Sequence, residues 1–287
     1  MGRDVVLELL LGLVLGAAIG WFGYRLRVFS RDGILGVTLV STAAFGAGGW
    51  VWGAVLLICL LGSSLCSHYG LGYKERLTER YGRNGRRGLV PVLAGAGWGM
   101  VLALLHLLAP RAMGIYAAYV GALAAMTADT WATELGVLSA RPPRLITSRR
   151  RVAAGTPGAV STLGIVAALS GAWLAGFVGL LLSVLWSWFH SAPWDRSLSW
   201  LPLAATAGGM VGMLVDSLLG AAAQGIYYCE RCEKETESRV HSCGESARQI
   251  RGWSWLTNDA INLVSSVVGA AVSAGVVVWL AQTSIWW

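Results

Sequence analysis

Eight long apolar segments divide the chain, and they constrain its fold more than any other feature of the sequence. A helix needs about 20 mostly apolar residues to cross the hydrocarbon core of a bilayer. Only 13% of the residues are charged, whereas soluble domains carry about 25%. We therefore expect an all-α integral membrane protein with about eight transmembrane helices, folded as a single polytopic membrane domain over residues 1–287. The expected spans are roughly Val5–Tyr24, Gly33–Gly49, Trp50–Cys66, Leu89–Ala109, Ile115–Met126 running on toward Leu138, Val160–Phe189, Leu201–Gly225 and Asn258–Ala281.

The basic residues lie almost entirely on one side of these segments. Of the 22 Lys and Arg residues, 19 follow the first, third, fifth or seventh segment. Loops rich in Lys and Arg stay in the cytoplasm, so both termini are predicted to lie outside, with the active face cytoplasmic and the plasma membrane as the location. Two full spans within the long segment Val160–Phe189 would break this pattern, so we expect one span there, preceded by a short helical or re-entrant entry. The net charge of +7 then reports topology rather than a nucleic acid partner.

Four acidic residues lie at membrane depth, where ionisable groups are costly and therefore candidates for function. All four lie near the predicted cytoplasmic ends of their helices, so they should form one layer. On the first of these helices, Asp129 shares a face with Thr133, and Thr130 shares a face with Glu134, because residues four apart are neighbours. Such an oxygen-rich lining suits Mg²⁺ with some waters retained; the structural alternative is hydrogen bonding between helices. The four acids are Asp129, Glu134, Asp216 and Asp259.

Two further polar clusters lie on later helices. Asp216, Gly220 and Gln224 share one face, with Ser217 beside them, and Gly220 would let a ligand approach the backbone. A helix-packing groove is the better explanation of Gly220 taken alone. Before the last apolar segment, Asn258 can cap a helix in the ordinary way. Asp259 and Asn262 then lie one turn inside on a shared face, which a cap does not require.

Anion-binding groups are expected beside these acids. In Gly155-Thr156-Pro157-Gly158, Thr156 is predicted as the N-cap of the following helix, with Pro157 at the first helical position. A helix N-terminus can bind phosphate, although a plain helix start is an equally good interpretation. The basic loops can be topology signals and lipid anchors, or they can supply bidentate phosphate donors. The sequence contains no Gly-x-x-x-x-Gly-Lys-Ser/Thr loop, so any nucleotide binds without one.

Three of the five cysteines occur with a histidine in a hydrophilic loop, which we delimit as residues 226–256. The spacing Cys229-x-x-Cys232, then His241-x-Cys243, is typical of a structural Cys₃His zinc site. A disulfide is the alternative, but the charge distribution places the loop in the reducing cytoplasm.

These motifs together resemble the transmembrane protein 19-like family, which includes the plant phytyl-phosphate kinase. The resemblance covers roughly residues 85–262, and one departure is Pro91 with Gly95, where family members often carry Gln and Asn. The strings that carry it are Ala128-Asp-Thr-Trp-Ala-Thr-Glu-Leu-Gly136, Gly155-Thr-Pro-Gly158, Asp216-Ser-Leu-Leu-Gly220 with Gln224, the Cys229 to Cys243 loop and Asn258-Asp-Ala-Ile-Asn262.

The resemblance implies Mg²⁺-dependent transfer of a phosphoryl group from a nucleoside triphosphate, with CTP expected, to an isoprenyl monophosphate lipid. It implies that Asp129, Glu134, Asp216 and Asp259 hold Mg²⁺ or orient its waters. Contacts to phosphate or nucleotide are assigned to Thr130, Thr133, Gly155, Thr156, Gly158, Ser217, Gln224, Asn258 and Asn262. Charge neutralisation is assigned to Lys74, Arg86, Arg87 and Arg150.

Two other classes of function stay open at this point. A transporter could use the same acids as a cation or proton path, but transporters favour inverted repeats and groups near the midplane, and neither is found here. A CDP-alcohol-type transferase would need an Asp-Gly-x-x-Ala-Arg pattern, of which Asp32-Gly33 supplies only a part.

Overall fold

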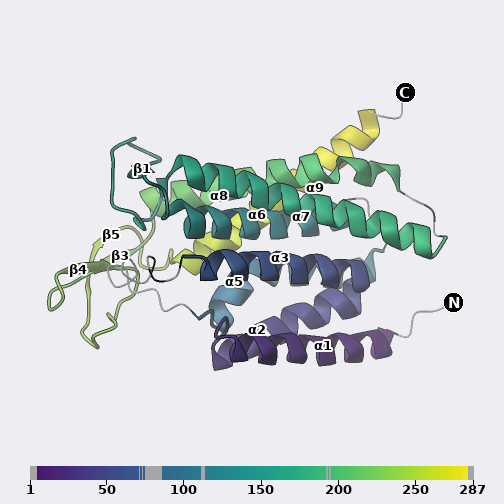
Figure 1. The fold of residues 1–287 in the computed structure, drawn as a ribbon, viewed down its shortest axis with the longest axis horizontal. Helices are drawn as coiled ribbons and strands as arrows, with labels where there is room; N and C mark the ends of the chain where they lie inside the picture. Colours follow the sequence, from purple (N-terminus) through teal and green to yellow (C-terminus); the bar gives the residue numbers. More distant parts are fainter. Residues whose placement is uncertain are drawn as a thin grey trace.

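The computed structural model describes residues 5–70, 72, 74, 86–110, 114–191, 193 and 195–283. Within these residues the chain forms eight α-helices, a π-helix, a 3-10 helix and five short strands. The helices lie side by side in one bundle, and the strands gather at one end of it, which we call the polar end (Figure 1). The α-helices are α1 (Val5–Arg25), α2 (Arg31–Thr42), α3 (Trp50–His68), α5 (Leu89–Leu108), α6 (Ile115–Gly136), α7 (Thr162–Phe189), α8 (Leu201–Ala222) and α9 (Asn258–Thr283).

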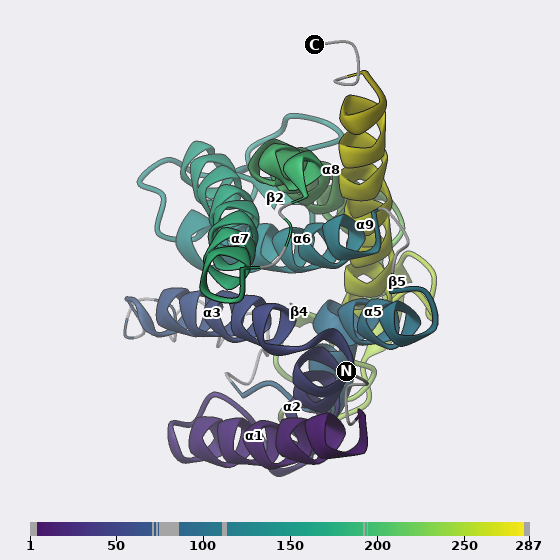
Figure 2. The same ribbon diagram turned by 90° about the vertical axis from the view of Figure 1, so that its right-hand side faces the viewer.

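Helix α6 lies at the centre of the bundle and packs against α3, α5, α7, α8 and α9 (Figure 2). Its buried face consists mostly of alanine and glycine, which allows neighbouring helices to approach closely. The buried Tyr119 donates its hydroxyl to the carbonyl oxygen of Trp52 at 2.8 Å, which joins α6 to α3. The central position of α6 means that side chains at its polar end can face several neighbours at once.

Helices α1 and α2 form a hairpin at the edge of the bundle (Figure 2). Every buried residue of α1 is a glycine at helical spacing: Gly12, Gly16, Gly20 and Gly23. A Cβ at Gly12 would lie 2.9 Å from the nitrogen of Gly46, in the π-helix η1 (Ala43–Gly48) that follows α2. Close backbone packing therefore holds α1, while its large apolar side chains point outward.

The described residues contain eight α-helices at the positions of the eight predicted spans, and six of them qualify as membrane spans by length and hydropathy. Six helices of the described residues are long and apolar enough to cross a membrane: α1, α3, α5, α7, α8 with its 3-10 entry η2 (Arg196–Trp200), and α9. The second predicted span is formed by α2, a 12-residue helix, together with η1, which continues it directly from Ala43. Helix α6 has the length, but its polar residues from Thr127 onward lower its hydropathy. Because α6 is enclosed by other helices, its polar groups meet protein rather than lipid.

The single span predicted for the sixth segment is one continuous helix of 28 residues, α7. Among the described residues, no separate helix lies between α6 and α7, so the predicted short helical entry is not seen. The chain enters α7 through β2 (Ala159–Val160), which pairs antiparallel with β1 (Arg144–Leu145).

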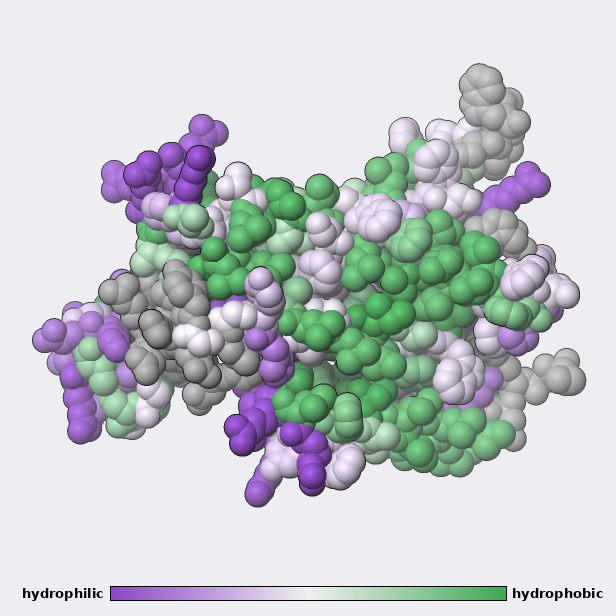
Figure 3. Space-filling view, viewed as in Figure 1, coloured by the Kyte–Doolittle hydropathy of each residue, from purple (hydrophilic) through white to green (hydrophobic). Residues whose placement is uncertain are grey.

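Apolar side chains cover the sides of the bundle, and hydrophilic residues gather mainly at the polar end (Figure 3). Large residues such as Val14, Leu65 and Val166 are at least 60% exposed, which suits contact with lipid tails. The start of α1 and the end of α9 both lie at the end away from the strands (Figure 1).

The loop between α8 and α9 folds as a small sheet at the polar end. Its strands are β3 (Ile226–Cys229), β4 (Lys234–Thr236) and β5 (Arg248–Arg251), in the order β4-β3-β5 with antiparallel pairing. Two backbone hydrogen bonds join the ends of the loop where it leaves α8 and enters α9: the N–H of Gly225 donates to the carbonyl oxygen of Leu256, and the N–H of Trp253 donates to the carbonyl oxygen of Ala223.

Candidate functional site

Two adjoining cavities lie at the polar end of the bundle. The large cavity has a volume of about 1260 Å³ and is lined by α2, α3, α5, α6, α9 and the sheet of the α8–α9 loop. The small cavity has a volume of about 90 Å³ and lies among α6, α7, α8 and the loop around Gly155. Six residues line both cavities and so form their common wall: Asp129, Thr133, Val137, Gly155, Glu237 and Asn258.

The structure brings nearly all of the predicted site residues together around these cavities. The large cavity is lined by Lys74, Arg86, Arg87, Asp129, Thr130, Thr133, Glu134, Gly155, Asn258, Asp259 and Asn262. The small cavity is lined by Asp129, Thr133, Gly155, Thr156, Gly158, Asp216, Ser217, Gln224 and Asn258. Arg150 lines neither cavity; it is exposed in the turn between β1 and β2, where its carbonyl oxygen accepts from the N–H of Leu145.

Glu134 is held by an ion pair that sequence spacing could not show. The Nζ of Lys74 lies 2.9 Å from Oε2 of Glu134 and donates to the carbonyl oxygen of Cys66 at 2.7 Å. The Ser67 hydroxyl donates to the other carboxylate oxygen at 3.0 Å. The Lys74 side chain is only 10% exposed. Both predicted residues therefore meet at the cavity wall, but as partners of one another.

The basic pair Arg86-Arg87 is positioned by the turn between α1 and α2. The backbone of Arg87 donates to the carbonyl oxygen of Val28 at 2.9 Å and accepts from the N–H of Ser30 at 3.1 Å. Two residues after Arg87, the N–H of Leu89 donates to the carboxylate of Asp32 at 2.9 Å, so Asp32 caps the start of α5. The guanidinium of Arg87 lies 3.5 Å from the Thr130 hydroxyl. Asp32 thus serves to hold the Arg-bearing segment at the cavity mouth.

The segment Gly155–Gly158 is a turn and not a helix start, which corrects the predicted capping role of Thr156. The Thr156 hydroxyl donates to the carbonyl oxygen of Ala153 at 2.8 Å. The N-cap of α7 is Ser161, whose hydroxyl accepts from the N–H of Gly164 at 3.1 Å. Gly158 has a φ of +76°, and a Cβ there would lie 2.4 Å from Cβ of Ala221. Glycine is required because this turn packs directly on α8.

The acids and amides of the last two helices face the same turn. The Ser265 hydroxyl of α9 lies 3.3 Å from Oδ2 of Asp216 on α8. Asn258 is the first residue of α9, but the capping group is Thr257, whose hydroxyl accepts from the N–H of Ala260 at 3.3 Å. The side chain of Asn258 is therefore not used as the cap and instead lines both cavities.

Sequence reasoning missed a segment of three consecutive residues in the α8–α9 loop, Glu237, Ser238 and Arg239, which lines the large cavity. We call this segment, directly after β4, the 237–239 arm. The buried Thr236 anchors it, because its hydroxyl accepts from the N–H of Ser238 at 3.2 Å. Arg239 contacts the Tyr227 hydroxyl at 3.3 Å and the carbonyl oxygen of Ser254 at 3.4 Å. A charged residue in a polar loop need not be buried in a bilayer, so the sequence gives no reason to single out Glu237 or Arg239 as functional.

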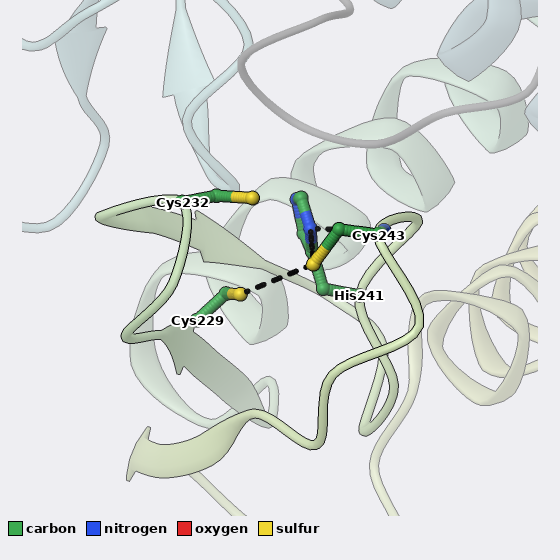
Figure 4. Close-up of side chains that lie close together, drawn as sticks. All are labelled: Cys229, Cys232, His241 and Cys243. Atoms are coloured by element: carbon green, nitrogen blue, oxygen red, sulfur yellow. Dashed lines mark hydrogen bonds between the residues drawn. The ribbon is translucent and has the colours of Figure 1, made fainter.

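The four predicted zinc ligands meet in the same loop (Figure 4). The ligand atoms of Cys229, Cys232, His241 and Cys243 all lie within 4.8 Å of one another. The sulfurs of Cys229 and Cys243 are 3.7 Å apart, too far for a disulfide bond of about 2.05 Å. Tetrahedral zinc with Zn–S bonds of about 2.3 Å places two sulfurs about 3.8 Å apart, which agrees with this spacing.

The easy deprotonation of one thiol also suits a metal at this cluster. Hydrogen bonds from the backbone of Glu245 and from His241 lower the pKa of the Cys243 thiol to about 6. The Cys232 thiol is hydrogen-bonded to Cys243, and this contact raises the pKa of Cys232 to about 11. One ligand is therefore already a thiolate near neutral pH, and a bound cation would stabilise the others in that form.

Comparison with known proteins supplies the family. The family described as Integral membrane protein DUF92 matches residues 14–270, which is most of the chain. The chain belongs to this family. A curated relative, Protein PGR of Arabidopsis thaliana, is 31% identical over 90% of this chain and 92% of its own length. The resemblance predicted from the motifs is thereby confirmed.

Two further proteins are similar to this chain. An uncharacterized membrane protein of Methanocaldococcus jannaschii is 28% identical over 76% of this chain and 84% of its own length. Another, from Synechocystis, is 26% identical over 93% of this chain and 78% of its own length. No solved structure matches the chain significantly. The family is therefore one of integral membrane proteins, and the names of these relatives state no reaction.

Proposed function

We propose that the protein is a membrane-embedded isoprenyl-phosphate kinase. It transfers the terminal phosphoryl group of a nucleoside triphosphate, with CTP as the expected donor, to an isoprenyl monophosphate, and the site faces the cytoplasm from the plasma membrane. The observation that carries the proposal is the large cavity, which joins a charged mouth to an apolar interior. Such a cavity suits a substrate with an anionic head and a hydrocarbon tail.

The charged mouth offers the groups that phosphoryl transfer needs. Five basic residues and four acids line the large cavity: Arg27, Lys74, Arg86, Arg87, Arg239, Asp129, Glu134, Glu237 and Asp259. Arg guanidinium groups bind phosphate oxygens in bidentate fashion. The acids and amides fit a hard cation such as Mg²⁺, which would neutralise phosphate charge when bound. No strong general base is required, because the acceptor phosphate is already anionic at neutral pH.

The reaction balances without a further reactant. An oxygen of the isoprenyl monophosphate forms a bond to the terminal phosphorus of the nucleotide, and the bond from that phosphorus to the bridging oxygen breaks. The products are an isoprenyl diphosphate and a nucleoside diphosphate. The role of the protein's own residues is to hold the two phosphates in line and to offset their charge, which are the main contributions to catalysis of this class.

The apolar interior extends far enough to hold the first part of an isoprenyl chain. Its walls are Val37, Val40, Leu60, Val92, Ala96, Ala125 and Met126, from four helices. On α6, nine residues separate Glu134 from Ala125, which corresponds to about 13 Å of helix at 1.5 Å per residue. Pro91 and Gly95, which depart from the family pattern, line the same region and add no polar group to it.

The test is an assay of the purified protein in detergent or nanodiscs. Incubation with labelled CTP, Mg²⁺ and phytyl or geranylgeranyl phosphate is expected to give the isoprenyl diphosphate and CDP in equal amounts. Release of CMP would instead support a transferase. Absence of turnover, combined with ion-dependent flux in proteoliposomes, would support a transporter. Either of the last two results contradicts the kinase proposal.

We also propose that the Cys₃His cluster binds a structural Zn²⁺. Metal analysis of purified protein is expected to give about one zinc per chain, because all four ligand positions are supplied by protein. The Cys229→Ser variant should lose the zinc and melt at a lower temperature, whereas Cys66→Ser, at the end of α3, should keep it. Wild-type protein without zinc, together with a Cys229→Ser variant of unchanged stability, would contradict the assignment.

Zinc retention should depend on pH in a defined direction. Protons compete with the metal for the ligand sulfurs, and the pKa of the Cys243 thiol is lowered to about 6. Retention is therefore expected to be high at neutral pH and to fall as the pH is lowered below about 6. Zinc release measured with a colorimetric chelator across pH 5 to 8 checks the direction. Release that instead increases toward pH 8 would be contrary to thiolate ligation.

A further inference from the structure

Exposed tryptophans gather at both ends of the helical bundle. At the end away from the strands, Trp50 begins α3, Trp188 lies at the end of α7, and Trp279 lies near the end of α9 (Figure 1). Each of the three side chains is at least 58% exposed. Tryptophan is enriched at the two interfaces of a membrane, where its ring sits at the level of the lipid headgroups. These residues therefore mark one interface of the bilayer.

The length of α9 places the other interface at the polar end. Trp279 lies 21 residues after Asn258, the first residue of α9, which corresponds to about 32 Å of helix at 1.5 Å per residue. The hydrocarbon core of a bilayer is about 30 Å thick, so the second interface falls close to the start of α9. Near the end of α1, at the same polar end, Trp21 is 58% exposed, and the guanidinium of Arg25 lies 5.5 Å from its ring centroid.

Two further exposed tryptophans lie in the α8–α9 loop, directly before α9. Trp253 is 58% exposed and Trp255 is 66% exposed, and their rings stack with centroids 5.5 Å apart and planes at 16°. Ser254, between them, lines the large cavity, but neither tryptophan does. The indole pair is therefore no part of the cavity wall. Contiguous exposed apolar surface of this kind commonly marks a contact with another protein or with a membrane.

Backbone contacts hold the indole pair beside the ends of α8 and α9. The N–H of Trp253 donates to the carbonyl oxygen of Ala223 at 2.9 Å, directly after α8. Gly252, with a φ of +73°, packs so closely that a Cβ there would clash with the carbonyl oxygen of Gln224. Trp255 precedes the first residue of α9 by three residues, which span at most about 10 Å. The pair is therefore held at the level at which α9 enters the bilayer.

From these positions we infer that Trp253 and Trp255 insert into the phospholipid headgroup layer and dock the α8–α9 loop on the membrane surface. The pair lies at the level of the second interface and leads into α9, whose Leu263 and Val264 are more than 40% exposed at its lipid-facing side. Residues 226–256 carry five basic residues and five acids, so attraction to anionic lipid is not the main contribution. Indole rings have an apolar body and a polar N–H, which suits the headgroup layer of any phospholipid.

Docking of the loop has a consequence for the large cavity. The 237–239 arm, Ser254 and Leu256 all line that cavity, and Arg239 donates to the carbonyl oxygen of Ser254 at 3.4 Å. An indole pair fixed at the headgroup level therefore fixes this part of the cavity wall at the same level. The mouth then meets the heads of membrane lipids directly. The docking itself does not depend on the proposed phosphoryl transfer.

Photocrosslinking of the purified protein in phosphatidylcholine nanodiscs tests the contact. Trp255→p-benzoylphenylalanine places a photoreactive ring in the pair. Glu235→p-benzoylphenylalanine is the matched control, because Glu235 is exposed on β4, at the opposite edge of the same small sheet from β5. Trp279→p-benzoylphenylalanine is the positive control at the other interface. Intact-mass measurement after irradiation is expected to give phospholipid adducts at positions 255 and 279, with yields at least about 10-fold above that at position 235.

Adducts at position 279 without adducts at position 255 would overturn the inference. Crosslinks from position 255 to a second copy of the chain would also overturn it, because the pair would then be a subunit contact. The yield at position 255 should be equal with and without phosphatidylglycerol, and adducts that require phosphatidylglycerol would contradict docking through the indole rings. Trp253→p-benzoylphenylalanine repeats the measurement on the neighbouring ring, and size-exclusion chromatography shows that each variant is folded.

Discussion

Replacing Asp129 with Asn is expected to lower isoprenyl-phosphate phosphorylation by about 1000-fold, the effect of removing a principal charge-stabilising group. Asp129 lines both cavities and lies on the central helix α6. The substitution keeps the size of the side chain but removes the charge that a cation and its waters would need. Turnover should therefore fall even at saturating nucleotide and isoprenyl phosphate. Raising the Mg²⁺ concentration should restore only part of it.

The measurement is the initial rate of CDP release over a range of Mg²⁺ concentrations. Asp195→Asn is a suitable control, because Asp195 is exposed and only caps the 3-10 helix η2 before α8. Its rate should match that of the wild type. Full turnover in Asp129→Asn would remove the basis for a metal role of this carboxylate.

Much of the helical framework could be predicted from the sequence, because apolar runs of about 20 residues leave few alternatives. The exceptions arise from tertiary packing. The second apolar segment changes from the α-helix α2 to the π-helix η1 at Ala43, and Gly46 of η1 packs against Leu9 of α1. The sequence pattern places the N-cap of α7 five residues too early, at Thr156 instead of Ser161. Both residues are good N-caps, and only the packing of the intervening turn on α8 decides between them.

The candidate site was predicted in its composition but not in its pairing. The acids were recognisable because a bilayer penalises them, and the structure gathers their side chains around two adjoining cavities. Their separate roles depend on neighbours that are distant in sequence. Glu134 is hydrogen-bonded to Lys74, which lies 60 residues earlier in the sequence. Glu237 could not be recognised, because nothing distinguishes an acid in a polar loop until the fold places it at the wall of both cavities.

Replacing Lys74 with Met is expected to lower the free energy of unfolding by about 3 kcal/mol, because it leaves a partly buried carboxylate without its cation. The Glu134 side chain is 29% exposed, and the Lys74 side chain is 10% exposed. The carbonyl oxygen of Cys66 would lose its donor as well. The double variant Lys74→Met with Glu134→Gln should recover part of this loss, since the neutral amide can stay beside Ser67 without a cation. Its destabilisation should therefore be smaller than the sum of the two single effects.

Denaturant titration of the four proteins in mixed micelles gives the coupling energy between the two side chains. Arg248→Met provides the control, because its partner Glu230 lies 4.0 Å away and both side chains are more than 70% exposed. Such exposed pairs contribute about 0–1 kcal/mol, so the control should change little. A coupling energy near zero would mean that Lys74 and Glu134 do not stabilise each other, so that Lys74 is available to the phosphates and Glu134 to a cation. A large coupling energy assigns Glu134 to the scaffold of the site, because a carboxylate committed to Lys74 holds that lysine at the cavity wall.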